Sequence, residues 1–321
     1  MNQKNIFKML MGFFLMFWCF DIGYFGSTVG AYDLPATGIT KCYDAEKEIP
    51  CPNPGESFYG QDGNYKKGAP LSYKDNGNGT VTDINTGMIW QQSDDGKKHT
   101  WSDACEYCKK LKLAGHSDWR IPTVDQLGSI VDFSRLDPAI NTIYFKGQSG
   151  WFWSGSYNHD DSKGASVVSF FNGGLGYYGR TGLLAVRCVR GGGSFVSSFV
   201  DNHDGTVTQN IPNKAGLMWQ QDPNSKTSNW QDACEYCNKL NLGGKKDWRL
   251  PNIRELETIV DRKGNNPLID SSFFCESGYY WSSSTLADMP NTAWLVSFGA
   301  GLPYSLSKGT TNFVRCVRDR P

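Results

Sequence analysis

The chain has 321 residues, with 32 basic and 32 acidic side chains and a hydrophobic fraction of 39%. Such a neutral balance provides no general field for nucleic acid or for an anionic membrane, so nucleic-acid partners are not expected. The length allows two ordinary domains.

Residues 1–31 have the pattern of a secretory signal peptide. Lys4 and Lys8 precede an apolar run over residues 9–20, which is too short to span a bilayer. Small residues at 29–31 predict cleavage before Tyr32, and a retained N-terminal anchor is the alternative. We therefore expect an exported protein of the periplasm, the cell surface or the medium, with no stable membrane span after cleavage.

The cysteines predict disulfides. The chain has ten cysteines, and loss of Cys19 with the leader leaves an odd number, so at least one thiol stays free or pairs with another chain. Behind a signal peptide this density favours disulfides over metal thiolates. Residues 32–71 form an N-terminal Cys-containing extension, in which Cys42 and Cys51 bracket a turn-rich loop and are expected to pair locally.

The rest of the chain is a duplication. Six sequence blocks occur twice in the same order, at an offset between 126 and 129 residues. Their first occurrences are DNGNGTVT, GMIWQQ, WSDACEYC, DWRIP, WS and VRCVR. The repeat defines a first module over 72–190 and a second over 198–321, joined by a Gly/Ser linker over 191–197.

Each module begins with a hairpin signal. Asn-Gly or Asp-Gly supplies the positive φ of a tight turn, and a Thr-Val-Thr strand follows. A calcium loop is the rival interpretation, but the twelfth position is Thr86 in one module and Pro212 in the other, where an EF-hand requires Glu. We therefore predict no metal site.

Two helices are expected in each module. Capping-box spacing occurs at Thr100 with Asp103, Thr123 with Gln126, Asn229 with Asp232, and Asn252 with Glu255. The later part of each module is rich in Gly, Ser and aromatic residues with short alternating runs, which indicates short strands and long loops. Helices grouped early and strands late predict an α+β fold.

This ordered set of blocks resembles the Lcl C-terminal domain family, named for the collagen-like adhesin of Legionella. The resemblance covers about residues 72–190 and 198–319, in two tandem copies. It implies two C-type-lectin-like modules, each with two helices and short antiparallel strands, stapled by disulfides. In that fold a cysteine of the first helix is bonded to one of the last strand, which pairs Cys108 with Cys188 and Cys237 with Cys316.

The remaining cysteines allow two schemes. In the first, Cys234 pairs with Cys275, which has no counterpart in the first module, and Cys105 is left as a free thiol. In the second, Cys105 and Cys234 form a bridge between the modules and Cys275 is left alone.

The leading functional hypothesis is an exported, non-enzymatic binding protein of the adhesin type. Loops on a rigid scaffold are where binding residues usually lie. The candidates are in the aromatic, glycine-rich loops late in each module: Asn172, Tyr177, Tyr178, Arg180 and Tyr304. The family adhesin binds sulfated polysaccharide, which makes polysaccharide one candidate class for the unknown extracellular ligand, although the neutral charge argues against a direct transfer. No cofactor is expected.

Two alternatives come from other classes. The CxxC motifs at Cys105–Cys108 and Cys234–Cys237 lie near helix starts, where a thiol pKa is lowered, so an envelope thiol–disulfide oxidoreductase is one. No thioredoxin-like βαβ pattern surrounds them, and no Gly-x-Ser-x-Gly motif supports a hydrolase. A purely structural surface protein is the other.

Overall fold

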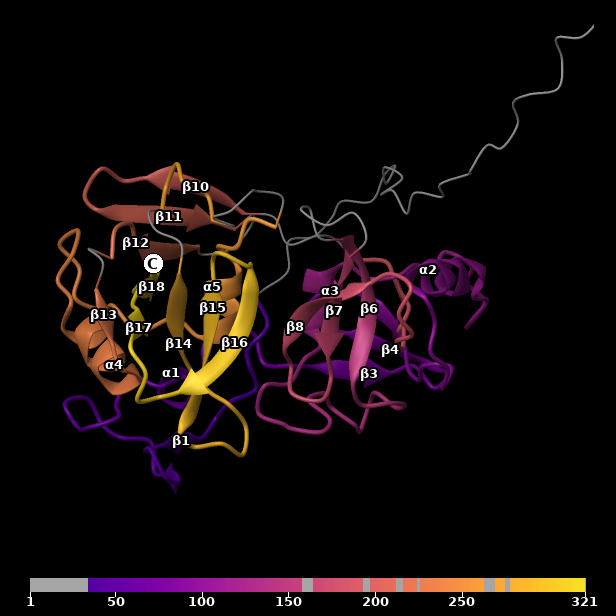
Figure 1. Cartoon of the computed structure of the whole chain (residues 1–321), viewed down its shortest axis with the longest axis horizontal. Helices are drawn as coiled ribbons and strands as arrows, with labels where there is room; N and C mark the ends of the chain where they lie inside the picture. The colour runs from indigo at the N-terminus through magenta and orange to yellow at the C-terminus, as the bar shows by residue number, and fades with distance from the viewer. Residues whose placement is uncertain are drawn as a thin grey trace, which may run out of the picture.

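A computed structural model describes residues 34–157, 164–192, 197–211, 216–223, 226–262, 269–274 and 278–320. The predicted signal peptide, residues 193–196 of the predicted linker, and Cys275 lie outside the described residues. The two modules lie side by side, and the extension lies with the second module rather than with the first, which it precedes in sequence (Figure 1). In the part of the chain that is described, no helix has the length and apolar character needed to cross a membrane.

The first module contains two antiparallel sheets. One has the strand order β3-β4-β5-β9, so the last strand of the module pairs with an early one, and the other has the order β6-β7-β8. The strands are β3 (Tyr73–Asp75), β4 (Thr80–Asp83), β5 (Ile89–Gln91), β6 (Trp151–Tyr157), β7 (Gly164–Ser169), β8 (Leu175–Gly179) and β9 (Val189–Arg190).

The second module repeats this plan. Its sheets have the orders β10-β11-β12-β18 and β13-β17-β14-β15-β16. The strands are β10 (Ser198–Asp201), β11 (Thr206–Asn210), β12 (Leu217–Gln220), β13 (Thr227–Ser228), β14 (Tyr279–Thr285), β15 (Thr292–Ser297), β16 (Leu302–Ser307), β17 (Asn312–Phe313) and β18 (Val317–Asp319). The extension contributes β1 (Cys42–Tyr43), β2 (Glu48–Ile49) and the short helix α1 (Asp62–Tyr65).

The helices of the modules begin where the capping signals predicted. They are α2 (Trp101–Lys110), α3 (Val124–Ser129), α4 (Trp230–Lys239) and α5 (Ile253–Glu257). Thr100 and Asn229 accept hydrogen bonds from backbone amides in the first turns of α2 and α4, and α3 and α5 each begin with a complete capping box. These side chains satisfy amides that have no partner within the helix.

The predicted fold class, α+β with C-type-lectin-like modules, is wrong. The structure is mostly β, with 34% of residues in strands and 13% in helices, and its sheets are several and small. The capping residues determine where α3 and α5 begin, but these helices end after six and five residues. Strands also precede the first helix in each module, so the division into early helices and late strands does not hold.

Three disulfides join cysteines of the described residues: Cys42–Cys51, Cys108–Cys188 and Cys237–Cys316. The two long-range disulfides join α2 to the segment before β9 and α4 to the segment before β18, and all four of their cysteines are 0% exposed. These are the pairs that the resemblance implied. Each of these two disulfides attaches the first long helix of a module to the C-terminal segment of the same module.

One hydrophobic core cluster spans both modules, and each module has a further cluster of its own. Buried side chains of both modules form a continuous cluster, in which Phe133 packs edge-to-face on Trp294 at 5.5 Å between ring centroids. Arg254 of α5 is 5% exposed and donates to the carbonyl oxygens of Gly128 and Ser129, at the end of α3 in the other module. A cation at the carboxyl end of a helix also complements the helix dipole.

Removal of the first long-range disulfide is expected to lower stability more than removal of the local one. Cys108–Cys188 closes a separation of 80 residues and Cys42–Cys51 one of 9. Loop-closure entropy predicts losses of about 4.5 kcal/mol for Cys108→Ala with Cys188→Ala and about 2.6 kcal/mol for Cys42→Ala with Cys51→Ala. Equilibrium denaturation measures both; an equal or larger loss for the local pair contradicts the expectation.

Arg254→Met is expected to destabilise the protein by at least about 3 kcal/mol, because buried carbonyl groups lose their donor. Arg135→Met is the control, since Arg135 forms a partly exposed ion pair with Asp132 at 2.8 Å and its loss should cost less than about 1 kcal/mol. Urea unfolding measures the two variants. Similar losses for both would show that Arg254 does not hold the modules together.

Candidate functional site

The late segments that the sequence predicted as loops are largely strands, β8 and β16, and they meet at the junction between the modules. β8 of the first module and β16 of the second are neighbours (Figure 1). Tyr304 on β16 is 38% exposed and packs edge-to-face on Tyr279, which is 45% exposed, at 5.7 Å. Burial, with the nearby Tyr279 and Tyr177 phenols, raises the pKa of Tyr304. Tyr177, Tyr279 and Tyr304 therefore form one group, which we call the junction tyrosines.

Arg262 fixes this arrangement. Its Nε donates to Asp125 Oδ1 of α3 at 2.8 Å, and its Nη1 donates to the carbonyl oxygen of Gly301 in the β15–β16 turn at 2.8 Å. The side chain thus attaches the turn of the second module to a helix of the first. The positions of the junction tyrosines follow from the packing of the modules and not from local sequence.

The other predicted residues lie elsewhere. The Arg180 guanidinium lies over the Trp101 ring at 4.7 Å and the Tyr157 ring at 5.6 Å, a cation–π arrangement. Tyr178 is 50% exposed and contacts Trp153 edge-to-face. Asn172 accepts a hydrogen bond from the Gly174 amide at 3.1 Å in the β7–β8 turn, so its side chain stabilises the turn. The five candidates are therefore not one site.

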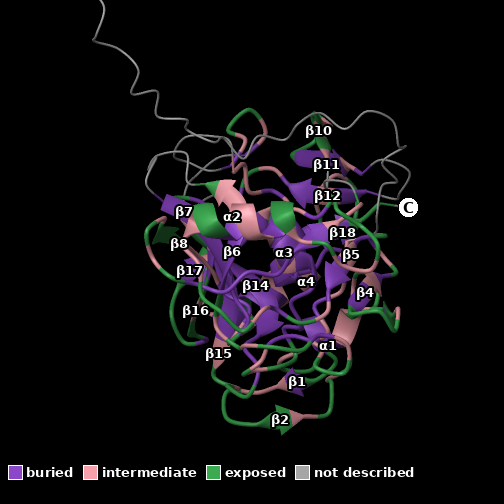
Figure 2. Ribbon diagram, turned by 90° about the vertical axis from the view of Figure 1, so that its right-hand side faces the viewer, coloured by how far each residue is buried: buried purple, intermediate pink, exposed green. Residues whose placement is uncertain are grey.

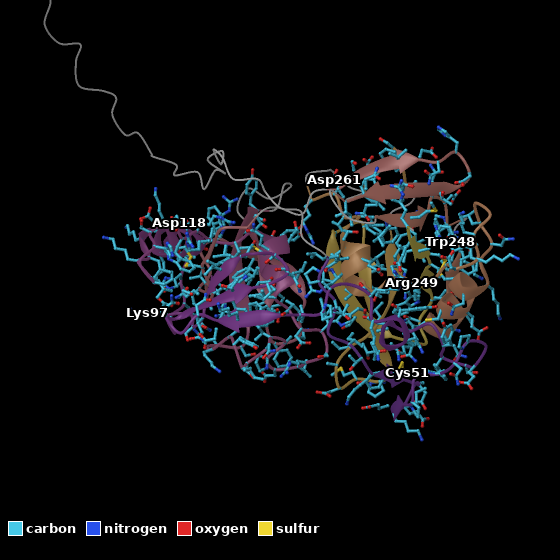
Figure 3. The ribbon with its side chains drawn as sticks, turned by 180° about the vertical axis from the view of Figure 1, so that it is seen from behind. Cys51, Lys97, Asp118, Trp248, Arg249 and Asp261 are labelled. Carbon is cyan, nitrogen blue, oxygen red and sulfur yellow. A yellow bond between two sulfur atoms is a disulfide. The ribbon has the colours of Figure 1, made fainter. Side chains whose placement is uncertain are left out.

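A cleft that the sequence did not indicate lies between the extension and α4. Its volume is about 470 Å³, and its walls include Tyr59 and Tyr65, whose rings pack edge-to-face at 5.8 Å. Tyr65 donates to Asn238 Oδ1 at 2.6 Å across 173 residues of sequence. The repeat comparison could not find this cleft because the extension occurs once. Figure 3 labels Trp248, another residue of its wall, together with Arg249.

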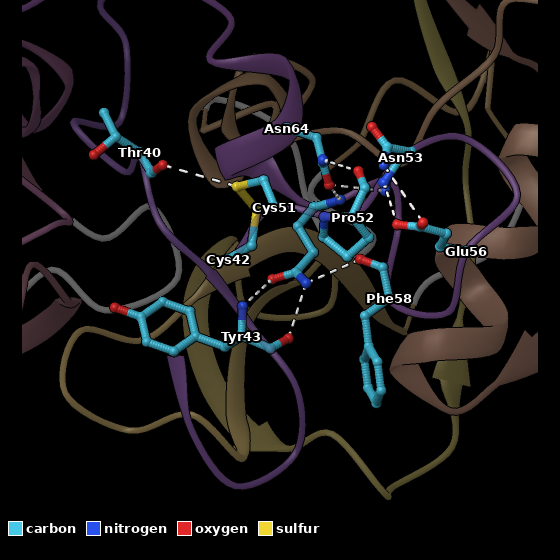
Figure 4. The surroundings of a disulfide bond; sticks show 11 residues. Thr40, Cys42, Tyr43, Cys51, Pro52, Asn53, Glu56, Phe58 and Asn64 are labelled. Atoms are coloured by element: carbon cyan, nitrogen blue, oxygen red, sulfur yellow. Dashed lines mark hydrogen bonds between the residues drawn. A yellow bond between two sulfur atoms is a disulfide. The ribbon is translucent and has the colours of Figure 1, made fainter. Parts of the chain in front are cut away.

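The local disulfide shapes the extension beside this cleft (Figure 4). Gln61 accepts a hydrogen bond from the Tyr43 amide at 2.9 Å and donates to the carbonyl oxygen of Phe58 at 2.9 Å. Asn64 donates to the carbonyl oxygen of Pro52 at 2.8 Å. These bonds hold the turn-rich loop in one conformation, because each satisfies backbone groups that have no strand partner.

A buried carboxyl group joins the extension to the second module. Asp62 is 2% exposed and accepts hydrogen bonds from Ser284 Oγ at 2.6 Å and from Thr37 Oγ1 at 2.8 Å. Burial raises the pKa of Asp62 to about 6, and the two hydroxyl donors oppose that rise. Nearby, Arg249 is held between Glu255 at 2.7 Å and Asp319 at 2.8 Å.

Three of the four CxxC cysteines do not have the environment of reactive thiols. Cys108 and Cys237 are in long-range disulfides. Cys234 is 1% exposed, and burial raises the pKa of its thiol to about 12, the opposite of activation. Cys105 is half-buried, and the alternative Cys105–Cys234 bridge is absent. Cys275 lies outside the described residues, so the Cys234–Cys275 bridge stays a prediction.

The Asp-rich turns act as hairpin turns. Asp75 accepts a hydrogen bond from the Gly77 amide and Asp201 accepts one from the His203 amide, and the flanking strands pair antiparallel. Over the described ranges, no cluster of three or more His, Cys, Asp or Glu side chains is placed to hold a metal ion.

The fold is thus a duplicated, disulfide-closed β module with an N-terminal extension on its second copy. The family model for the Lcl C-terminal domain matches residues 79–190 and 206–318. The chain therefore belongs to the Lcl C-terminal domain family, with two tandem copies of the domain. No curated protein matches the chain in sequence.

The raised pKa of Asp62 predicts a pH-dependent stability. A carboxyl group whose pKa is higher in the folded state binds more protons there, so stability falls as pH rises from about 4 to about 6. The shift corresponds to on the order of 3 kcal/mol. Asp62→Asn keeps an acceptor for both hydroxyl groups and should remove this slope. Urea unfolding of both proteins at pH 4, 5, 6 and 7 measures the difference; parallel pH profiles would contradict the assignment.

Proposed function

We propose that the protein is an exported, non-enzymatic binding protein, and that the junction tyrosines carry its ligand-binding surface. Three disulfides and the lack of a membrane-spanning helix among the described residues are compatible with export. Family membership is compatible with a surface or adhesin-like protein. The observation that carries the proposal is the meeting of two exposed tyrosines of the second module, Tyr279 and Tyr304, with the half-buried Tyr177 of the first.

The proposed ligand is a polysaccharide. A tyrosine ring packs on the apolar face of a sugar ring and its hydroxyl donates or accepts a hydrogen bond, so a pair of exposed tyrosines suits a chain of sugars. Tyr279 and Tyr304 are packed against each other, which lowers the entropy lost when they hold a ligand. A neutral chain does not require the ligand to be anionic.

The thiol–disulfide alternative has less support. An oxidoreductase requires two neighbouring cysteines that exchange a disulfide, and a thiol with a lowered pKa. Here the second cysteine of each CxxC motif is bonded to the end of its module, and burial raises the pKa of Cys234. A failure of the protein to reduce insulin is the expected result.

The test is binding to an array of polysaccharides and oligosaccharides. Tyr177→Ala with Tyr304→Ala is expected to weaken binding at least about tenfold, since aromatic contacts contribute about 0.5–1.5 kcal/mol each beyond their burial. Tyr157→Ala removes a more exposed ring, 56% exposed, away from the junction tyrosines and should leave binding unchanged. If no member of the array binds, the structural alternative is favoured. If the Tyr177→Ala with Tyr304→Ala variant and the Tyr157→Ala variant lose the same affinity, the ligand binds elsewhere.

A further inference from the structure

The first module carries an open counterpart of the surface that the extension covers on the second. In the second module Trp230, Cys234 and Ser284 are at most 1% exposed. Their equivalents in the repeat, Trp101, Cys105 and Ser156, are half-buried. Thr285 is 4% exposed and its equivalent Tyr157 is 56% exposed. Figure 2, which views the molecule from the side of the first module, shows half-buried and exposed residues of α2 at the surface.

The covered surface is held by contacts that run the length of the extension. Asp62 binds Ser284 at one point, and Tyr65 binds Asn238 at another. Lys308 donates to the carbonyl oxygen of Asp44 at 3.3 Å while its ammonium lies over the Trp230 ring at 4.0 Å. The backbone at Gly60 passes directly over Cys234, since an added Cβ would lie 3.4 Å from the Cβ of that cysteine.

The open surface keeps the geometry that these contacts use. Ser156 Oγ accepts from the Val124 amide at 3.1 Å, as Ser284 Oγ accepts from the Ile253 amide at 3.1 Å. In the second module the hydroxyl proton of Ser284 is therefore free to be donated to Asp62. Arg180 lies over Trp101 as Lys308 lies over Trp230, and in both modules the backbone carbonyl of the cation accepts from the amide of the tryptophan at 3.0 Å.

The charges on the two surfaces differ. Lys109 replaces Asn238, and Gly191 replaces Asp319, so the open surface gains one cation and loses one carboxylate. Gln126 replaces Glu255 beside the equivalent arginine, Arg120, which removes a second carboxylate. Two of these sites are direct contacts of the extension in the second module, through Tyr65 and Lys67. Asp125 replaces Arg254, which also contacts the extension, but the charge of Asp125 is paired with Arg262 at 2.8 Å. Around Lys109 and Gly191 the open surface is therefore complementary to a more acidic segment than the extension.

We propose that this surface of the first module is a docking site for an acidic polypeptide segment of a partner protein, seated as the extension is seated on the second module. Ser156 would donate to a carboxylate of the segment, Arg180 and Lys109 would supply positive charge, and the exposed Tyr157 would cover its apolar part. The chain's own extension is not the occupant, because the chain has one extension and the second module holds it. The proposal is independent of the junction tyrosines.

The test uses synthetic peptides of residues 34–69 with the Cys42–Cys51 disulfide formed, titrated into the full chain by calorimetry. The parent peptide should bind with a stoichiometry of one. A Lys67→Glu peptide should bind at least about fivefold more tightly, because Lys109 and Gly191 stand where the second module has Asn238 and Asp319. An Asp62→Asn peptide should bind more weakly than the parent.

Protein variants locate the site. Lys109→Glu and Ser156→Ala should each weaken binding of the Lys67→Glu peptide at least about fivefold. Lys74→Glu, an exposed change of the same charge on β3, should not, and neither should Tyr304→Ala. Three results would overturn the proposal: no binding of either peptide up to about 1 mM, equal affinities in Lys109→Glu and Lys74→Glu, or binding of heparin fragments but not peptides through Lys109.

Discussion

In each module the first long helix is attached to the segment before the last strand, and the other elements of the module depend on that attachment. The disulfide is one part of it. The Gln91 side chain accepts from the Cys188 amide and donates to the Tyr107 hydroxyl on α2, and Gln220 makes the same pair of bonds with Cys316 and Tyr236. The glutamine of the Trp-Gln-Gln block thus joins the strand, the helix and the module end.

A buried arginine completes the attachment. Arg187 is 2% exposed and donates to backbone carbonyl oxygens of Gln91, Gln92 and Lys146, and Arg315 makes the first two of these bonds at Gln220 and Gln221. A guanidinium group has five donors and can satisfy several carbonyl groups at once, which a lysine cannot do in one plane. The Val-Arg-Cys-Val-Arg block is therefore structural, and binding has to be sought on the loops and the module surfaces.

How much of this followed from sequence depends on the range of the interactions. Capping residues such as Thr123 and Asn252 act within three residues, so helix starts could be predicted. The family resemblance implied the pairing of the closing cysteines. The fold class failed because short capping signals do not determine helix length, and the small sheets depend on pairing between distant strands. The contact of Tyr65 with Asn238 and the meeting of Tyr177 with Tyr304 had no local signal.

Divergence between the modules explains why two similar units form a junction. Position 125 of the first module is Asp and the equivalent position 254 of the second is Arg, so α3 and α5 present opposite charges. Arg254 binds the end of α3, while Asp125 binds Arg262 of the second module. An arginine at position 125 would place a like charge beside Arg262. Burial raises the pKa of Glu257 to about 7 at the same junction, and its equivalent is Gly128, whose carbonyl accepts from Arg254.

The extension belongs to this junction as much as to the second module. The Thr37 carbonyl accepts from the Phe133 amide of the first module, while the Thr37 hydroxyl donates to Asp62 of α1, which in turn accepts from Ser284 of the second module. Arg254 also donates to the Ala36 carbonyl at 3.1 Å. The extension therefore contacts both modules before the chain enters β3. Its contacts with Asp319 and Asn238 place most of it on the second module. A single extension that runs this way leaves the matching surface of the first module uncovered.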